Sequence, residues 1–235
     1  MNYAVIDPRM PDDAKRGIRE NGFEIIKLPP SPALQPQVAS HPDMLVYFGE
    51  KLITSRNYYT IAKTEIDEIL RISCKSVEFA SEVIKSDYPF DVRFNAFTVG
   101  NCLFCSEKGV SVAVTNDAKH RGLEIVYVKQ GYAKCSTVVV GENAIITADG
   151  GIASAARSRG IDTLVVSAGD VRLDGYDTGF LGGASGTFGD KVFFCGNLGG
   201  HPDCVKITEF CEKHGKKVVS LSPSPLFDAG TIFFI

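Results

Sequence analysis

The sequence lacks long apolar runs and a strong excess of either charge. No apolar stretch approaches the roughly 20 residues that a helix needs to cross a bilayer, and the N-terminus shows no signal-peptide pattern. Lys and Arg number 25 against 28 Asp and Glu, which leaves a net charge of −3. This balance gives no reason to expect nucleic acid or an anionic membrane as a partner. We therefore expect a cytoplasmic protein.

The sequence also lacks signatures of a metal or a cofactor. Its seven cysteines are scattered and odd in number, which favours reduced thiols over a disulfide framework. Cys102 and Cys105 are spaced like half of a zinc site, but no second pair follows at ligand spacing. On a strand, residues three apart point to opposite faces, so we interpret both as core cysteines. We expect no metal and no cofactor.

What the sequence does contain is a repeated unit, clearest in the middle of the chain. Apolar runs at 137–140 and 144–147, separated by a short turn, predict a β-hairpin. A helical stretch at 152–159 ends at Gly160, which can adopt the left-handed conformation that closes a helix. Residues 161–167 then predict a third strand. The order is strand, strand, helix, strand.

The same pattern recurs along the chain. The segments GEKLIT, GNCLFC and GDKVFFC, which begin at Gly49, Gly100 and Gly189, repeat the hairpin. The two ends supply a fifth unit, because a strand at 231–235 ends the chain and a strand at 3–6 begins it. Such self-similarity predicts a repeat architecture, and a unit shared by both termini favours a closed ring without exposed sheet edges.

We therefore predict a single α+β domain, a five-bladed pseudo-symmetric β/α-propeller of ββαβ units closed by pairing of the N- and C-terminal strands. The expected units are 226–235 with 1–30, then 41–82, 91–130, 134–169 and 180–222.

Further expectations concern single segments. Apolar residues 44–48 and 94–99 should form first strands of their units, with Asn95 as the polar residue on its strand. A second His-Pro-Asp, at 201–203, stands at a helix start, so capping is its expected role. Residues 59–72 should form an amphipathic helix whose core stripe is Ile61, Ile66, Ile69 and Leu70.

Polar residues gather where the chain enters the first strands. His41 and Asp43 flank a proline that fixes their spacing, so they can act as base and orienter or hold a cation. Cys135 follows Lys134, whose ammonium could lower the thiol pKa and make it reactive; the other interpretation is a buried, inert cysteine. Asp228 is a carboxylate at the same kind of place as Asp43.

Two other segments have open interpretations. Asp7 and Arg9, after the first strand, fit a solvated loop with a surface ion pair better than a site. Segment 174–186 is rich in glycine, which is costly in chain entropy and typical of tight turns or close backbone approach to a ligand. It lacks the Lys-Ser/Thr ending of a phosphate loop, which argues against a nucleotide site.

The arrangement of units resembles the pentein β/α-propeller, the fold of guanidino-group-modifying enzymes such as arginine and agmatine deiminases, dimethylarginine hydrolases and amidinotransferases. The segments HPDML, QGYAKCS, GFLGGASG and the DAG near the end resemble an uncharacterised bacterial family of that fold. The resemblance implies a central polar channel lined by residues entering each first strand. It places near one site His41, Asp43, Asn95, Cys135, Ser136, Ser185 and Asp228, and we add Gly182 and Gly183 for backbone contacts.

The enzymes of this fold use a cysteine nucleophile on the last strand, a histidine acid/base and carboxylates that hold the guanidinium. The closing segment here has no cysteine. One hypothesis is a hydrolase or transferase acting on a C–N bond of a guanidino or amino-acid-like small molecule. In it Cys135 is the nucleophile, His41 the acid/base, and Asp43 and Asp228 bind the cation. The other hypothesis is a non-catalytic pentein that binds a small molecule or a protein. Neither predicts an oligomeric state.

Overall fold

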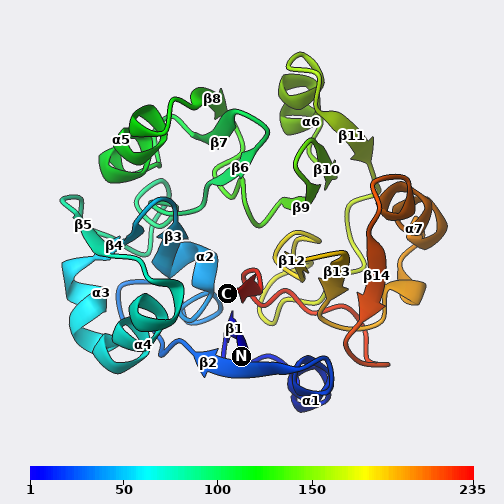
Figure 1. The fold of residues 1–235 in the computed structure, drawn as a ribbon, viewed down its shortest axis with the longest axis horizontal. Coiled ribbons are helices and arrows are strands. Elements are labelled where there is room, and N and C mark those ends of the chain that lie inside the picture. Colours follow the sequence, from blue (N-terminus) through cyan, green and yellow to red (C-terminus); the bar gives the residue numbers. More distant parts are fainter.

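The computed structural model describes all residues 1–235. It contains five three-stranded sheets set around a common centre, with the longer helices toward the outside and α2 near the centre (Figure 1). The sheets are β15 (Phe233–Phe234), β1 (Asn2–Ile6) and β2 (Phe23–Lys27); β3 (Val46–Phe48), β4 (Leu52–Ser55) and β5 (Val77–Ala80); β6 (Phe97–Val99), β7 (Cys102–Ser106) and β8 (Glu124–Val128); β9 (Thr137–Gly141), β10 (Ala144–Thr147) and β11 (Asp162–Val165); and β12 (Ser185–Phe188), β13 (Lys191–Phe194) and β14 (Lys217–Ser220).

Every sheet has the same internal order. The first two strands named above pair antiparallel, and the middle strand pairs in parallel with the third. A parallel pair needs a crossover, and a helix supplies it each time. The crossover helices are α1 (Asp12–Glu20), α3 (Arg56–Ile61) with α4 (Lys63–Ser73), α5 (Val112–His120), α6 (Gly150–Arg157) and α7 (Cys204–Lys213); α2 (Pro42–Leu45) and the 3-10 helix η1 (Leu198–Gly200) are single turns. No helix is long and apolar enough to span a membrane.

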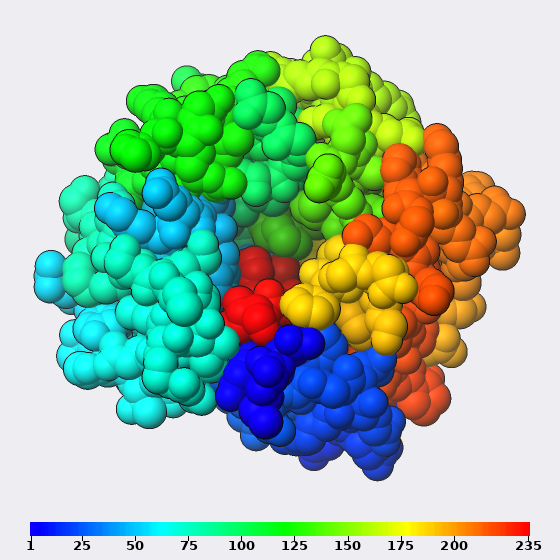
Figure 2. Space-filling model, viewed as in Figure 1, coloured from blue at the N-terminus to red at the C-terminus, as the bar shows by residue number.

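The predicted pairing of the terminal strands is confirmed. Ala4 lies opposite Phe234 in an antiparallel pair, and the two termini lie close together at the centre (Figure 1). Phe23 then packs edge-on against Phe193 at 5.7 Å between ring centroids, and Phe193 packs against Phe234 at 4.8 Å. Such pairs add about 0.5–1.5 kcal/mol each beyond the burial of their area. The C-terminal residues lie in the central hollow of the space-filling view (Figure 2).

Local signals explain where the helices start and stop. The Asp149 carboxylate accepts a hydrogen bond from the Ile152 amide at 2.7 Å and so caps α6. Ser55 caps α3 in the same way by accepting from the Tyr58 amide. Gly160, with a φ of +72°, follows α6 as predicted. Cys102 and Cys105 are both on β7 and belong to different core clusters, as expected of opposite strand faces.

Three predictions about secondary structure were wrong. Met44 and Leu45 belong to α2, because Pro42 starts a helical turn where a strand was expected. Asn95 lies in the loop before β6, so the strand begins only at Phe97. The helix expected at 59–72 is two helices that meet at Ala62. The break turns Ile61 outward, leaving it 46% exposed, while Ile66 and Ile69 are buried as predicted.

Two predictions about polar residues were also wrong. Asp203 does not cap α7; its carboxylate instead accepts hydrogen bonds from the Ser167 amide and the Lys206 ammonium. Asp7 is completely buried, not part of a solvated loop, and it holds the Arg9 guanidinium through hydrogen bonds.

Candidate functional site

A pocket of about 380 Å³ contains most of the candidate catalytic residues and Asp228. It is lined by residues from loops that are distant in sequence, namely Gln35, Val38, His41, Met44, Ser86, Tyr88, Asp91, Tyr132, Cys135, Leu173, Tyr176, Thr178, Phe180 and Asp228. Its volume falls in the range of small-molecule sites, which are mostly apolar with a few converging polar groups.

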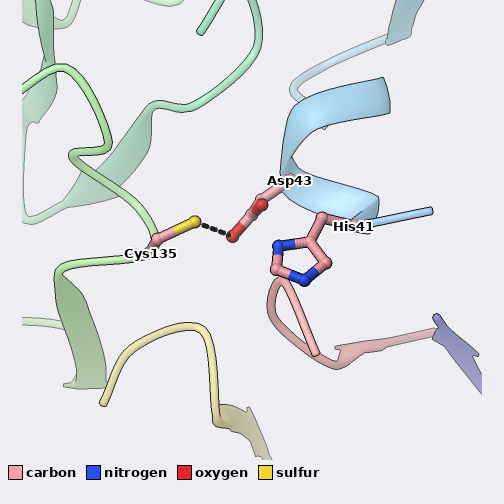
Figure 3. Close-up of side chains that lie close together, drawn as sticks. All are labelled: His41, Asp43 and Cys135. Carbon is pink, nitrogen blue, oxygen red and sulfur yellow. Dashed lines mark hydrogen bonds between the residues drawn. The ribbon is translucent and has the colours of Figure 1, made fainter. Parts of the chain in front are cut away.

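The thiol of Cys135 is held by two polar partners. Its Sγ donates to Oδ2 of Asp43 at 3.0 Å (Figure 3), and it receives the side-chain N–H of Asn95 at 3.0 Å. The side-chain oxygen of Asn95, Oδ1, accepts hydrogen bonds from the backbone amides of Lys134 and Cys135. Asn95 therefore fixes both the loop that carries the thiol and the thiol itself.

The Asp43 carboxylate has a second fixed partner. The hydroxyl of Thr231 donates to the same Oδ2 at 2.7 Å. Thr231 has a φ of +72°, which is a strained conformation for a β-branched residue. Such strain is characteristic of functional sites. The other oxygen of Asp43, Oδ1, is buried and has no hydrogen-bond partner.

His41 stands directly before α2 with its ring buried beside the same cluster. One ring nitrogen faces the Asp43 carboxylate and the other points away (Figure 3). Neither nitrogen makes a hydrogen bond; Nδ1 lies 3.9 Å from Asp228 and Nε2 lies 3.9 Å from Asp7. Burial lowers the pKa of His41, against the opposing effect of the two carboxylates, so the neutral ring is favoured.

Asp228 is held by the backbone around it. Its carboxylate accepts hydrogen bonds from the amides of Phe180 at 2.8 Å and Gly230 at 3.0 Å. Gly230 has a φ of +64°, and a Cβ there would lie 2.2 Å from the Cβ of His41. The turn that orients Asp228 therefore also packs against His41. Burial raises the pKa of Asp228.

The surroundings of Cys135 favour a buried, protonated thiol over a thiol activated by Lys134. The Lys134 ammonium is directed at the carbonyl of Thr137, at 3.2 Å, and not at the thiol. Burial and the nearby carboxylates of Asp43 and Asp228 raise the pKa of Cys135 well above its usual value. A protonated thiol donating to Asp43 is the form that this environment favours.

Sequence reasoning missed a second polar pair on the pocket wall. The hydroxyl of Tyr132 donates to Oδ2 of Asp91 at 2.6 Å, and Oδ1 of Asp91 is buried without a partner. Burial raises the pKa of Asp91. Asp91 precedes the first strand of its sheet, as Asp43 and Asp228 precede theirs, so the rule that singled out those two would also have found it.

The remaining predicted residues lie around the pocket without lining it. Ser136 lines a smaller neighbouring pocket, and the Ser185 hydroxyl donates to the carbonyl of Gly182. A Cβ on Gly182 would lie 2.4 Å from the Thr137 nitrogen, and one on Gly183 would lie 2.0 Å from the Asp228 carboxylate. The close approach made possible by these glycines is therefore between parts of the chain.

One group of side chains has donor atoms suited to a metal. Ligand atoms of His41, Asp43 and Cys135 all lie within 4.8 Å of one another, and all three residues are buried. Nitrogen, oxygen and sulfur donors of this kind bind zinc. The sequence showed no metal-ligand spacing because Cys135 comes from a different sheet unit than the other two.

A family model described as "Family of unknown function (DUF6873)" matches residues 5–233. The chain belongs to this family. No curated protein matches the chain in sequence.

Solved structures with the same fold are distant in sequence. Dimethylarginine dimethylaminohydrolase from Pseudomonas aeruginosa, complexed with citrulline, superposes with a TM-score of 0.60 at 12% identity, covering 94% of this chain and 91% of that chain. Agmatine deiminase from C. jejuni gives 0.56 at 7% identity, covering 94% and 87%. Inosamine-phosphate amidinotransferase from Streptomyces griseus gives 0.52 at 12% identity, covering 92% and 76%. All three are pentein-fold enzymes, so this family member shares the pentein fold.

Proposed function

We propose that this chain is a pentein-fold protein, its five sheets being the blades of a closed propeller, and that its central pocket binds a small organic cation of the guanidino or amino-acid-like type. The observation that carries the proposal is the Asp228 carboxylate, because the residue is only 1% exposed and yet lines the pocket. A buried carboxylate needs a cationic partner to be stable in its charged form.

The rest of the pocket fits such a ligand. Around Asp228 lie a second carboxylate, Asp91, and the aromatic rings of Tyr132, Tyr176 and Phe180. Aromatic faces attract cations and cover the methylene groups of an alkyl chain. Because the structural relatives include a complex with citrulline and an agmatine deiminase, guanidino compounds are the first class to test.

The test uses a charged probe and its neutral analogue. Isothermal titration of the chelator-treated protein should show that butylguanidine binds at least tenfold more tightly than butylurea. The Asp228→Asn variant should lose most of this preference. Asp117→Asn is the matched control, since Asp117 is a buried carboxylate that accepts the Glu50 amide and lies outside the pocket. Equal binding of the two probes to the wild-type protein would refute the proposal.

A second candidate function is catalysis by Cys135, which the Cys135–Asp43 hydrogen bond favours. Sγ would bond to the central guanidinium carbon while its proton passes to Asp43. One C–N bond would break, the amine would leave with a proton, and water would replace sulfur to give the ureido product. His41 would act as the acid/base, because both of its ring nitrogens are free of hydrogen bonds.

Product analysis by mass spectrometry separates the two functions. A catalyst should release ureido product in a reaction that Cys135→Ala abolishes and Cys195→Ala, a buried cysteine outside the pocket, leaves intact. Binding without turnover would identify a non-catalytic pentein that acts as a binding module.

A further inference from the structure

The charged side chains that line the pocket are all acidic. Of the 14 lining residues, Asp91 and Asp228 carry carboxylates and none is Lys or Arg. Lys134, the buried ammonium nearest in sequence to the pocket, is directed at the Thr137 carbonyl. The pocket therefore has two sites for positive charge and no cation to neutralise a carboxylate on a ligand.

Each of the two carboxylates accepts a hydrogen bond from one of two aromatic residues whose rings stack on each other. The Tyr132 hydroxyl donates to Asp91, and the Phe180 amide donates to Asp228. The rings of Tyr132 and Phe180 stack, with centroids 6.0 Å apart. Both carboxylates and both rings line the same pocket, which suits a ligand with an alkyl chain and a polar group at each end.

Asp91 also has unused bonding capacity. Its Oδ2 accepts from Tyr132, but Oδ1 is buried without a donor, and the residue is only 5% exposed. An unpaired buried oxygen is costly unless a ligand supplies a donor. Tyr132 fixes the carboxylate in place and leaves this oxygen free.

We propose that the pocket selects a dication without a carboxylate, an aminoalkylguanidine or diamine, in which Asp228 holds one cationic end and Asp91 holds the other. This inference rests on the proposed function and narrows it. An α-amino acid such as arginine would bring an unpaired carboxylate close to Asp91, so repulsion and desolvation disfavour it.

The experiment compares three ligands by isothermal titration with the full chain: agmatine, butylguanidine, which lacks the amine, and arginine, which adds a carboxylate. Agmatine should bind at least tenfold more tightly than each of the others, since charge-assisted hydrogen bonds are the strong ones. Asp91→Asn should reduce the advantage over butylguanidine to less than about threefold, because the amine of agmatine loses its partner while the guanidinium of both ligands keeps Asp228. Asp87→Asn, an exposed carboxylate nearby, should change neither.

The outcomes separate this inference from the function on which it rests. If agmatine and butylguanidine bind wild-type protein equally, Asp91 is not a subsite, although the guanidinium site stands. If arginine binds as tightly as agmatine, the exclusion of carboxylates is wrong. If butylguanidine does not bind better than butylurea, both proposals fail. Because these comparisons use the wild-type chain, they remain decisive even if Asp91→Asn does not fold.

Discussion

Substituting Gly182 by alanine should destabilise the fold more than a substitution that adds one methyl group at the surface. The new Cβ would lie 2.4 Å from the Thr137 nitrogen and 2.5 Å from the Cys135 oxygen. Both are backbone atoms, so no side chain can rotate away. The two segments are also joined by the Gly183 amide, which donates to the Cys135 carbonyl at 2.8 Å.

The magnitude follows from these two contacts. Overpacking in a filled interior costs about 1–3 kcal/mol, and loss of the hydrogen bond adds about 0.5–1.5 kcal/mol. We expect the free energy of unfolding to fall by about 3 kcal/mol. For a chain of this size that is a decrease in Tm of roughly 6–12 °C.

Urea unfolding followed by far-UV circular dichroism measures the effect, since the chain has no Trp for fluorescence. Gly150→Ala is the control, because nothing lies within 4 Å of its Cβ and it is in α6. It should leave stability unchanged or raise it by up to about 1 kcal/mol. If Gly182→Ala unfolds within about 0.5 kcal/mol of the wild type, the close backbone contact is wrong.

Three further predictions concern other parts of the molecule. Iodoacetamide at pH 8 should modify the exposed Cys74 of the native protein and spare Cys105, whose pKa burial raises to about 12; mass spectrometry showing equal rates would contradict this. Phe193→Ala should cost about 3–5 kcal/mol in urea unfolding, because its ring is buried where the terminal strands meet, and a cost under about 1 kcal/mol would argue against that packing. Hydrogen bonds from Lys206 and the Ser167 amide hold the pKa of Asp203 below its usual 3.8. The stability that ionised Asp203 contributes is therefore complete above pH 3.8 and is lost as pH falls through the lower pKa of the folded state. The loss of stability in Asp203→Asn at pH 7 should shrink in strong acid, and a loss that does not change with pH would refute this.

The repeated hairpins were predictable because their signals are local. Glycine turns and alternating apolar runs fix each antiparallel pair, and the strands at the two ends of the chain are recognisable as halves of one unit. Short segments before the first strands were not predictable. At residues 42–45 a proline starts a helical turn within an apolar run, and burial of Met44 and Leu45 is the same in a helix as in a strand.

The sequence indicated which residues to examine better than it indicated their chemistry. Ligand atoms of His41, Asp43 and Cys135 lie within 4.8 Å of one another, and Nδ1 of His41 lies 3.9 Å from Asp228. The direction of the thiol pKa shift was not predictable. The sequence places Lys134 beside Cys135, whereas the fold places Asp43 against the sulfur. The pairing of Asp91 with Tyr132 joins residues 41 positions apart, which no local pattern reveals.

The most direct test of the central pocket is a crystal structure of the protein with agmatine. The proposals predict the guanidinium or the amine within hydrogen-bond distance of Asp228, the opposite end at Asp91, and the alkyl chain across the rings of Tyr132 and Phe180. Agmatine bound elsewhere on the molecule, with the pocket occupied only by solvent, would contradict them.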